Sequence, residues 1–236
     1  LVVANVNSTY LVLTSSSLLE PGMNYIVRLS DEVQTEAAFV CRNTASGIGI
    51  VSINASKLTA QQRNSIAVAQ LDNSYMVKQG DLVIASGKLY ETSKGVSYGT
   101  IAGSKVEYSK DSGYEVFETS VSITAGGFAI FFNFEGNVVG VSKASTDTSS
   151  KFIGISDLKA QIETMINEHG IMYCGITGQN VTEELAAKYG LPSGVYISNV
   201  DIDSPAYYAG LQAGDVISVI NGQSILTIQQ FSEKLY

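Results

Sequence analysis

The sequence of 236 residues has one histidine, two cysteines and fewer basic than acidic residues. One histidine cannot supply a site with two or more histidine ligands, and two cysteines exclude a disulfide framework. The 14 basic and 22 acidic side chains give a net charge of −8, which argues against a nucleic acid or an anionic membrane surface as the main partner. Because no run of about 18 apolar residues is present, no segment is expected to span a bilayer.

What the sequence does contain is a series of short β-rich runs, and the hydrophobic content of 45% is enough for one sizeable domain or two modest ones. Gly, Ser and Asn separate the runs, a pattern typical of an all-β barrel or sandwich. The predicted strands cover 10–14, 25–29, 37–41, 48–53, 81–85, 97–101, 128–132 and 138–141. Glu135-Gly136-Asn137 is expected to form a tight hairpin between the last two.

The period then changes to that of a helix over 156–170, where Leu158, Ile162, Met165 and Ile166 share one face. The single histidine, His169, lies near the end of this helix and is expected to be exposed there. Further short elements follow: a helix over 182–189, strands over 194–198 and 216–220, and helices beginning near Pro205 and Thr227. The sequence therefore predicts a mainly β domain over 1–155, a linking helix over 156–170 and an α+β domain over 171–236.

Nucleotide and metal motifs fail on their spacing. Six residues separate Gly80 from Gly87-Lys88, where a phosphate-binding loop has four. Asp201-x-Asp203 lacks the third ligand and the glycine of a calcium loop, so it is expected to be a solvated loop. No cofactor and no metal are predicted, and Cys41 and Cys174 are expected to be small apolar side chains in different domains.

The second half carries a recognisable motif. Tyr173-Cys174-Gly175-Ile176 resembles the carboxylate-binding loop of PDZ domains, and 204–217 followed by Asn221-Gly222 resembles the PDZ segment of the HtrA/Deg serine proteases. Consecutive N–H groups of such a loop can hold a terminal carboxylate while the next strand pairs with the peptide. The expected peptide-binding residues are Tyr173, Cys174, Gly175, Ile176, Ile228 and Phe231, although the last two can equally face the core.

The first half resembles the trypsin-like double β-barrel of the same family. The catalytic histidine of that family lies in a stretch that matches 13–19, where Ser17 occupies its position. Its catalytic aspartate lies in a motif that matches 46–50, where Gly47 occupies the position. The nucleophile maps to Ala125–Phe128, most simply to Ala125, and none of these four residues is Ser, Thr or Cys. A serine nucleophile needs a base and an orienting acid, so the resemblance implies that the triad is degenerate.

Three functions are therefore open. The first is a pseudoprotease whose PDZ domain binds peptides or protein C-termini, with the barrel as scaffold or oligomerisation platform. The second is a serine endopeptidase that works through unconventional residues such as Ser122 or Thr124, although the adjacent strand motifs contain no lysine to form a dyad. The third is a purely structural element.

The resemblance also implies context. The parent protein is expected to be bacterial and extracytoplasmic, to be held at a membrane through a segment absent from this chain, and to form a homo-oligomer such as a trimer. The PDZ domain is expected to be incomplete at its C-terminal end, because the module normally continues into at least one more strand.

Overall fold

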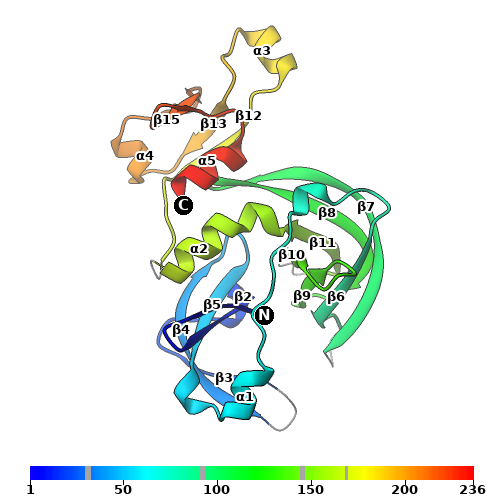
Figure 1. Cartoon of the computed structure of the whole chain (residues 1–236). Helices are drawn as coiled ribbons and strands as arrows, with labels where there is room; N and C mark the ends of the chain where they lie inside the picture. Colours follow the sequence, from blue (N-terminus) through cyan, green and yellow to red (C-terminus); the bar gives the residue numbers. More distant parts are fainter. Residues whose placement is uncertain (30–32, 91–93, 144–146, 168–169) are drawn as a thin grey trace. The chain divides into compact units, whose positions relative to one another are not determined.

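The structure, a computed structural model, describes residues 1–29, 33–90, 94–143, 147–167 and 170–236 (Figure 1). The chain forms two compact units. The first contains Leu1–Ser104 and Phe117–Ile171, and the second contains Lys105–Val116 and Met172–Tyr236. A hairpin tip that the sequence analysis placed in the β domain thus packs with the C-terminal residues.

The first unit begins with a five-stranded antiparallel sheet of order β1-β2-β5-β4-β3. Its strands are β1 Val2–Val6, β2 Thr9–Ser15, β3 Asn24–Arg28, β4 Gln34–Asn43 and β5 Ile48–Asn54. Short helices follow: η1 Ser16–Leu18 after β2, and η2 Ala55–Lys57 and α1 Ala60–Ser65 after β5. A core around Val51 and Ile53 forms because alternate side chains of the strands face inward.

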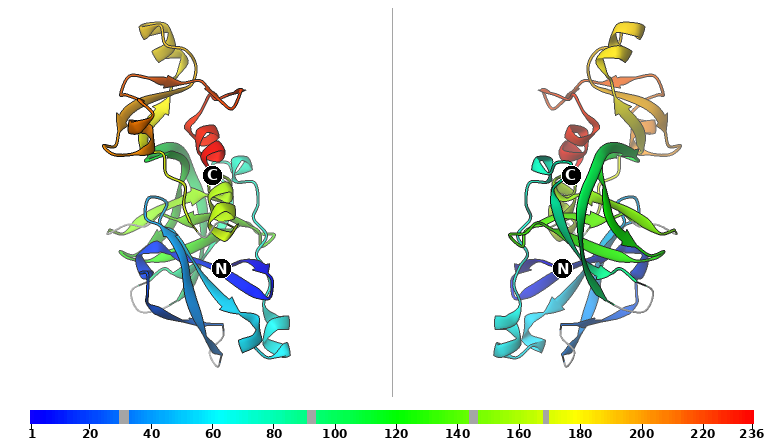
Figure 2. Two further views of the ribbon diagram at one scale, coloured as in Figure 1. Left: turned by 90° about the vertical axis from the view of Figure 1, so that its left-hand side faces the viewer. Right: turned by 90° about the vertical axis from the view of Figure 1, so that its right-hand side faces the viewer.

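A closed barrel of order β10-β11-β8-β7-β6-β9 completes the first unit. Its strands are β6 Leu82–Lys88, β7 Gly95–Ser109, β8 Ser112–Ile123, β9 Phe128–Phe132, β10 Val138–Ser142 and β11 Ser149–Gly154. Phe152 is fully buried in its core and stacks on Phe117 and Phe131, with ring centroids 5.1 and 4.2 Å away. β7 and β8 are much longer than their neighbours and form the long hairpin in Figures 1 and 2.

A helical segment ends the first unit. The turn η3 Ser74–Met76 precedes the barrel, and η4 Ile155–Leu158 leads directly into α2 Lys159–Asn167. Leu158, Ile162 and Met165 are buried, as the helical periodicity predicted. His169 lies outside the described residues, so its exposure stays a prediction. None of the helices in the described ranges is long and apolar enough to cross a membrane.

The second unit has a three-stranded antiparallel sheet of order β12-β13-β14. Its strands are β12 Ile176–Asn180, β13 Val195–Val200 and β14 Val216–Ile217; β15 Val219–Ile220 and β16 Gln223–Ser224 form a separate pair. Its helices are α3 Glu183–Tyr189, α4 Pro205–Tyr208 and α5 Ile228–Leu235. Ile176, Ile197, Ile228 and Phe231 lie in the core of this unit. The predicted mainly β fold with a smaller α+β unit is confirmed.

Candidate functional site

The segments that match the family's histidine and aspartate motifs lie next to each other in the first unit. Because β2 pairs with β5, Ser15 lies opposite Ile48, and the N–H of Ser16 donates to the carbonyl oxygen of Gly47 at 2.9 Å. The hydroxyl oxygens of Ser15 and Ser17 are 2.8 Å apart. The histidine position therefore holds the hydroxyl group of Ser17, and the aspartate position holds Gly47, which has no side chain.

The turn that matches the nucleophile motif connects β8 to β9. The N–H of Gly127 donates to the carbonyl oxygen of Thr124 at 2.8 Å, Gly126 has φ +65°, and Ala125 is exposed. A Cβ atom at Gly127 would lie 2.6 Å from the carbonyl oxygen of Lys88, so glycine is required for the close approach to β6. The hydroxyl of Thr124 is buried without a hydrogen-bond partner.

A cleft of about 610 Å³ lies within the first unit and is lined from both its sheets. Leu13, Leu18 and Arg28 come from the first sheet and its following turn, and Lys88 and Phe128 come from the barrel. Lys88 pairs with Phe128 across β6 and β9. The sequence shows no lysine in the adjacent strand motifs, but barrel closure, which is not visible in local sequence, brings Lys88 at the end of β6 beside the nucleophile turn.

The predicted carboxylate-binding loop precedes β12 in the second unit. Gly175 has φ +93°, and a Cβ atom there would lie 2.2 Å from the Cβ of Ser204, so only glycine fits. The carbonyl oxygens of Cys174 and Gly175 accept hydrogen bonds from the N–H groups of Ala206 and Asp201, both at 2.8–2.9 Å. These bonds fix the loop so that its own N–H groups point to one place.

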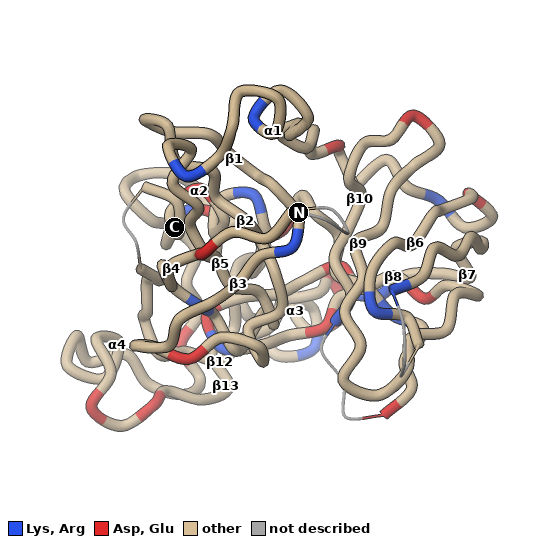
Figure 3. The backbone as a smooth tube through the Cα atoms, turned by 90° about the horizontal axis from the view of Figure 1, so that it is seen from below, with Lys and Arg blue, Asp and Glu red and all other residues tan. Residues whose placement is uncertain are grey.

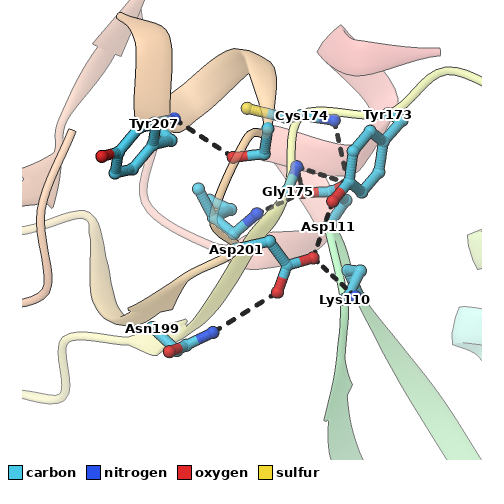
Figure 4. A network of polar contacts seen from close by, with 10 residues as sticks. Lys110, Asp111, Tyr173, Cys174, Gly175, Asn199, Asp201 and Tyr207 are labelled. Carbon is cyan, nitrogen blue, oxygen red and sulfur yellow. Dashed lines mark hydrogen bonds and ion pairs between the residues drawn. The ribbon is translucent and has the colours of Figure 1, made fainter. Parts of the chain in front are cut away.

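That place is occupied by the carboxylate of Asp111 (Figure 4). The N–H groups of Cys174, Gly175 and Ile176 donate to it at 2.8–2.9 Å, with Gly175 contacting both oxygens. Asp111 is only 3% exposed. Three consecutive N–H groups that converge on an anion form a nest, the arrangement that recognises carboxylates. In this structure the loop therefore holds the side-chain carboxylate of Asp111, and its binding of a peptide C-terminus stays a prediction.

The hairpin tip around Asp111 also makes main-chain contacts with β12. The N–H of Asp111 donates to the carbonyl oxygen of Ile176 at 2.8 Å, and Lys110 forms an antiparallel bridge with Thr177. Asp111 has φ +56°, a conformation that Asp tolerates better than most residues. The tip therefore extends the edge of β12 by a short additional segment.

An ion pair stands beside this contact. Lys110 Nζ lies 2.5 Å from Asp201, whose carboxylate also accepts a hydrogen bond from the Tyr173 hydroxyl at 2.7 Å (Figure 4). The hydrogen bonds from Lys110 and then Tyr173 lower the pKa of Asp201, and the same contacts raise the pKa values of Lys110 and Tyr173. Asp201, expected in a solvated loop, also connects the tip to Tyr173.

Helix α5 lies on the other side of the tip. Its first N–H, on Ile228, donates to the side-chain oxygen of Asn180 at the end of β12, at 2.7 Å. A Cβ atom at Gly113 would lie 2.1 Å from Ile228 Cγ2, and the hydroxyls of Ser112 and Ser232 are 3.1 Å apart in a buried position. Ile228 thus contacts the tip, whereas Phe231 is a buried core residue.

Both cysteines are free. Burial raises the pKa of Cys41 to about 11. The pKa of Cys174 is raised by burial and, secondly, by the charge of Asp111. Neither thiol is therefore activated as a nucleophile.

Within the described ranges, no group of three or more His, Cys, Asp or Glu side chains could hold a metal ion.

The charged residues, which make up 15% of the sequence, are interspersed along the backbone, with acidic and basic residues alternating in many places (Figure 3).

Comparison with known families matches residues 2–141 to the trypsin-like peptidase domain and residues 196–236 to the PDZ domain. The chain belongs to the HtrA family of trypsin-like proteases. A similar protein from Pseudomonas savastanoi pv. phaseolicola, named a probable periplasmic serine endoprotease DegP-like, is 27% identical over 226 residues, which cover 91% of this chain and 46% of that protein. A Halomonas elongata protein of the same name is 25% identical with the same coverage.

Solved structures show the same fold. The HtrA-type protease AlgW with a tripeptide has a TM-score of 0.67 at 20% identity and covers 99% of this chain and 78% of that one. AlgW with a decapeptide has a TM-score of 0.65 at 20% identity, with coverages of 99% and 72%. The chain spans about half the length of the curated relatives it matches.

Proposed function

We propose that this chain is a non-catalytic HtrA homologue whose second unit binds peptides or protein C-termini. Residues 1–155 without the hairpin tip act as scaffold or oligomerisation platform, and residues 171–236 act as the binding module. The observation that supports binding most strongly is the nest at Cys174–Ile176, which holds a carboxylate through three N–H groups. The AlgW structures named for a bound tripeptide or decapeptide are consistent with this role.

The loss of proteolysis in this proposal rests on three positions. Ser17, Gly47 and Ala125 offer no imidazole, no carboxylate and no nucleophile, and a serine protease needs all three to activate its attacking hydroxyl. Incubation with unfolded casein, together with labelling by a fluorophosphonate, tests it. We expect no turnover and no label; casein turnover that the fluorophosphonate abolishes would overturn the proposal.

The alternative is an endopeptidase that works through residues other than a Ser-His-Asp triad. The pairing of Lys88 with Phe128, at the end of the nucleophile turn, favours this alternative because it places a lysine beside that turn. Lysine can serve as the base for a Ser or Thr nucleophile when its pKa is lowered. If any casein turnover is seen, Lys88→Met and one of the two hydroxyl variants, Ser122→Ala or Thr124→Ala, should remove it under this alternative. Loss of turnover in Lys88→Met and in one hydroxyl variant, but not in an exposed-lysine control such as Lys57→Met, would support a dyad.

Peptide binding is tested by selecting displayed peptides with free C-terminal carboxylates against the same peptides carrying C-terminal amides. A working nest requires the carboxylate, so we expect enrichment of the free-acid form alone. Equal enrichment of both forms would favour the purely structural role. We also propose an extracytoplasmic location, because the relatives are named periplasmic endoproteases.

A further inference from the structure

The carboxylate-binding loop has no free donor left for a ligand. The N–H groups of Cys174, Gly175 and Ile176 all donate to Asp111, and both oxygens of that carboxylate are used. A second carboxylate at the same nest would need the same N–H donors and would be repelled by the buried negative charge of Asp111. A peptide C-terminus and Asp111 therefore exclude each other.

The main chain of the tip also takes the place of a peptide main chain. A peptide that adds to a sheet edge forms N–H to carbonyl bonds with the strand beside it. The N–H of Asp111 already donates to Ile176, and Lys110 already bridges to Thr177. Asp111 thus pairs with β12 through its backbone and fills the nest with its carboxylate. The last residue of a bound peptide would do the same, except that its carboxylate belongs to the main chain, whereas that of Asp111 belongs to the side chain.

The tip fills the space between β12 and α5 as well. Asp111 and Ser112 are 3% and 1% exposed, and Gly113 lies so close to Ile228 that no side chain fits. Lys110 closes the outer side through its ion pair with Asp201. A peptide could reach the nest only after these contacts separate.

We propose that the tip Lys110–Gly113 is an internal ligand of the PDZ unit, which closes the peptide site until an external C-terminus displaces it. This inference rests on the proposed peptide-binding function. The tip is tethered, so it competes at a high effective concentration, and the apparent affinity for a peptide is the intrinsic affinity multiplied by the fraction of molecules in which the site is open. Weakening the tip should therefore tighten peptide binding without changing the nest.

Two substitutions at Asp111 weaken the internal ligand in different ways. Asp111→Asn keeps the shape and tolerates the positive φ but removes the charge from the hydrogen bonds, and Asp111→Gly removes the side chain at a φ that glycine prefers. Asp203→Asn is the matched control, because Asp203 is also an aspartate at positive φ, +62°, in the same unit, and it is exposed. A third variant, Gly113→Ala, keeps Asp111 but places a methyl group against Ile228.

The probe is a degenerate decapeptide mixture with free C-terminal carboxylates, compared with the same mixture amidated. Peptides captured by the immobilised full chain are quantified by mass spectrometry. We expect Asp111→Asn, Asp111→Gly and Gly113→Ala to capture about tenfold more free-acid peptide than the unsubstituted chain. Asp203→Asn should capture as much as the unsubstituted chain, and amidated peptides should stay at background throughout.

The outcomes separate the two proposals. If the unsubstituted chain and the Asp111 variants capture equal amounts of free-acid peptide, and amidated peptide stays at background, the internal ligand is overturned while peptide binding stands. If no variant prefers the free acid, the proposed peptide binding fails. Hydrogen exchange guards against a variant that does not fold: the amides of Cys174–Ile176 should exchange at least tenfold faster in Asp111→Gly, while those of β13 keep their rates. Unchanged exchange at the loop in a folded variant would also overturn the internal ligand.

Discussion

The N–H of Gly175 donates to both carboxylate oxygens of Asp111, at 2.8 and 2.9 Å, although the two residues are 64 positions apart in the chain. The carboxylate of Asp111 and the N–H groups of the loop offset each other's cost of burial. A carboxylate that is 3% exposed is costly without donors, and a nest of N–H groups is costly when it faces no acceptor. When the tip leaves, water or another carboxylate must take its place, which couples the state of the hairpin to ligand binding.

The first prediction concerns the backbone of the nest. Gly175→Ala should destabilise the second unit by about 2 kcal/mol or more, because it combines a positive φ with a clash against Ser204. Gly214→Ala is the matched control: its φ of +103° is similar to the +93° of Gly175, but no atom lies within 4 Å of the added Cβ. It should cost about 1 kcal/mol.

Hydrogen exchange of the β12 and β13 amides measures this difference locally, which matters because a chain of two units need not unfold in one step. Equal costs for the two alanine variants would show that the loop has room for a side chain, contrary to the geometry.

The second prediction concerns the ion pair between Lys110 and Asp201. Hydrogen bonds from Lys110 and Tyr173 lower the pKa of Asp201. A carboxylate whose pKa is lower in the folded state stabilises the fold above its unfolded pKa, and this contribution is lost as the pH falls through the folded value. Lys110→Met should therefore raise the pKa of Asp201 and flatten the loss of stability below about pH 4.

NMR titration of the Asp201 carboxyl carbon in the unsubstituted chain and in Lys110→Met checks the shift. Asp201→Asn should remove the same part of the pH dependence of stability. The effect should shrink in high salt, because the pair is solvent-exposed. A titration midpoint that Lys110→Met leaves unchanged would contradict the assigned cause.

The third prediction concerns the barrel core. Phe152 is fully buried and stacks on both Phe117 and Phe131, so Phe152→Ala should cost about 3–5 kcal/mol of stability. Phe134→Ala is the control, since Phe134 is 63% exposed and should change stability by about 0.5 kcal/mol or less. Urea denaturation followed by tyrosine fluorescence measures both. Similar costs for the two variants would mean that the stacked cluster is not the centre of the barrel core.

Much of the fold could be predicted because its strands are short, apolar and bounded by turn residues. The strands missed by the sequence analysis are β1, β8, β11 and the short β16. β11 begins with Ser149 and Ser150, and β8 carries polar residues at many positions, so neither is an apolar run. Their pairing follows from closure of the barrel and of the sheets, which depends on partners far away in the sequence.

The binding loop could be predicted from its motif, but its occupant could not. In the sequence, Lys110 and Asp111 are two polar residues with no motif around them. No sequence pattern near them indicates a contact with Cys174–Ile176. Asp201 was missed as a contact residue for the same reason. Ile228 was expected at the site or in the core and contacts both the tip and the core. Such contacts arise when a long hairpin places its tip beside a distant loop.

The last prediction uses Cys174 to report on that contact. Burial raises the pKa of Cys174 first, and the charge of Asp111 raises it further. Asp111→Asn removes the second cause, so the pKa of Cys174 should fall, while that of Cys41 in the first unit should stay at about 11. The rate of alkylation by iodoacetamide follows the thiolate fraction, so its pH midpoint gives each pKa by mass spectrometry of the two cysteine peptides.

The plateau rate at high pH separates charge from access. A lower midpoint with the same plateau indicates that only the charge was lost, and a higher plateau indicates that the tip has also moved away from the loop. Asp203→Asn should change neither quantity. An unchanged midpoint for Cys174 in Asp111→Asn would mean that the carboxylate does not stand beside the thiol in solution, and the contact between Asp111 and the loop would then have to be abandoned.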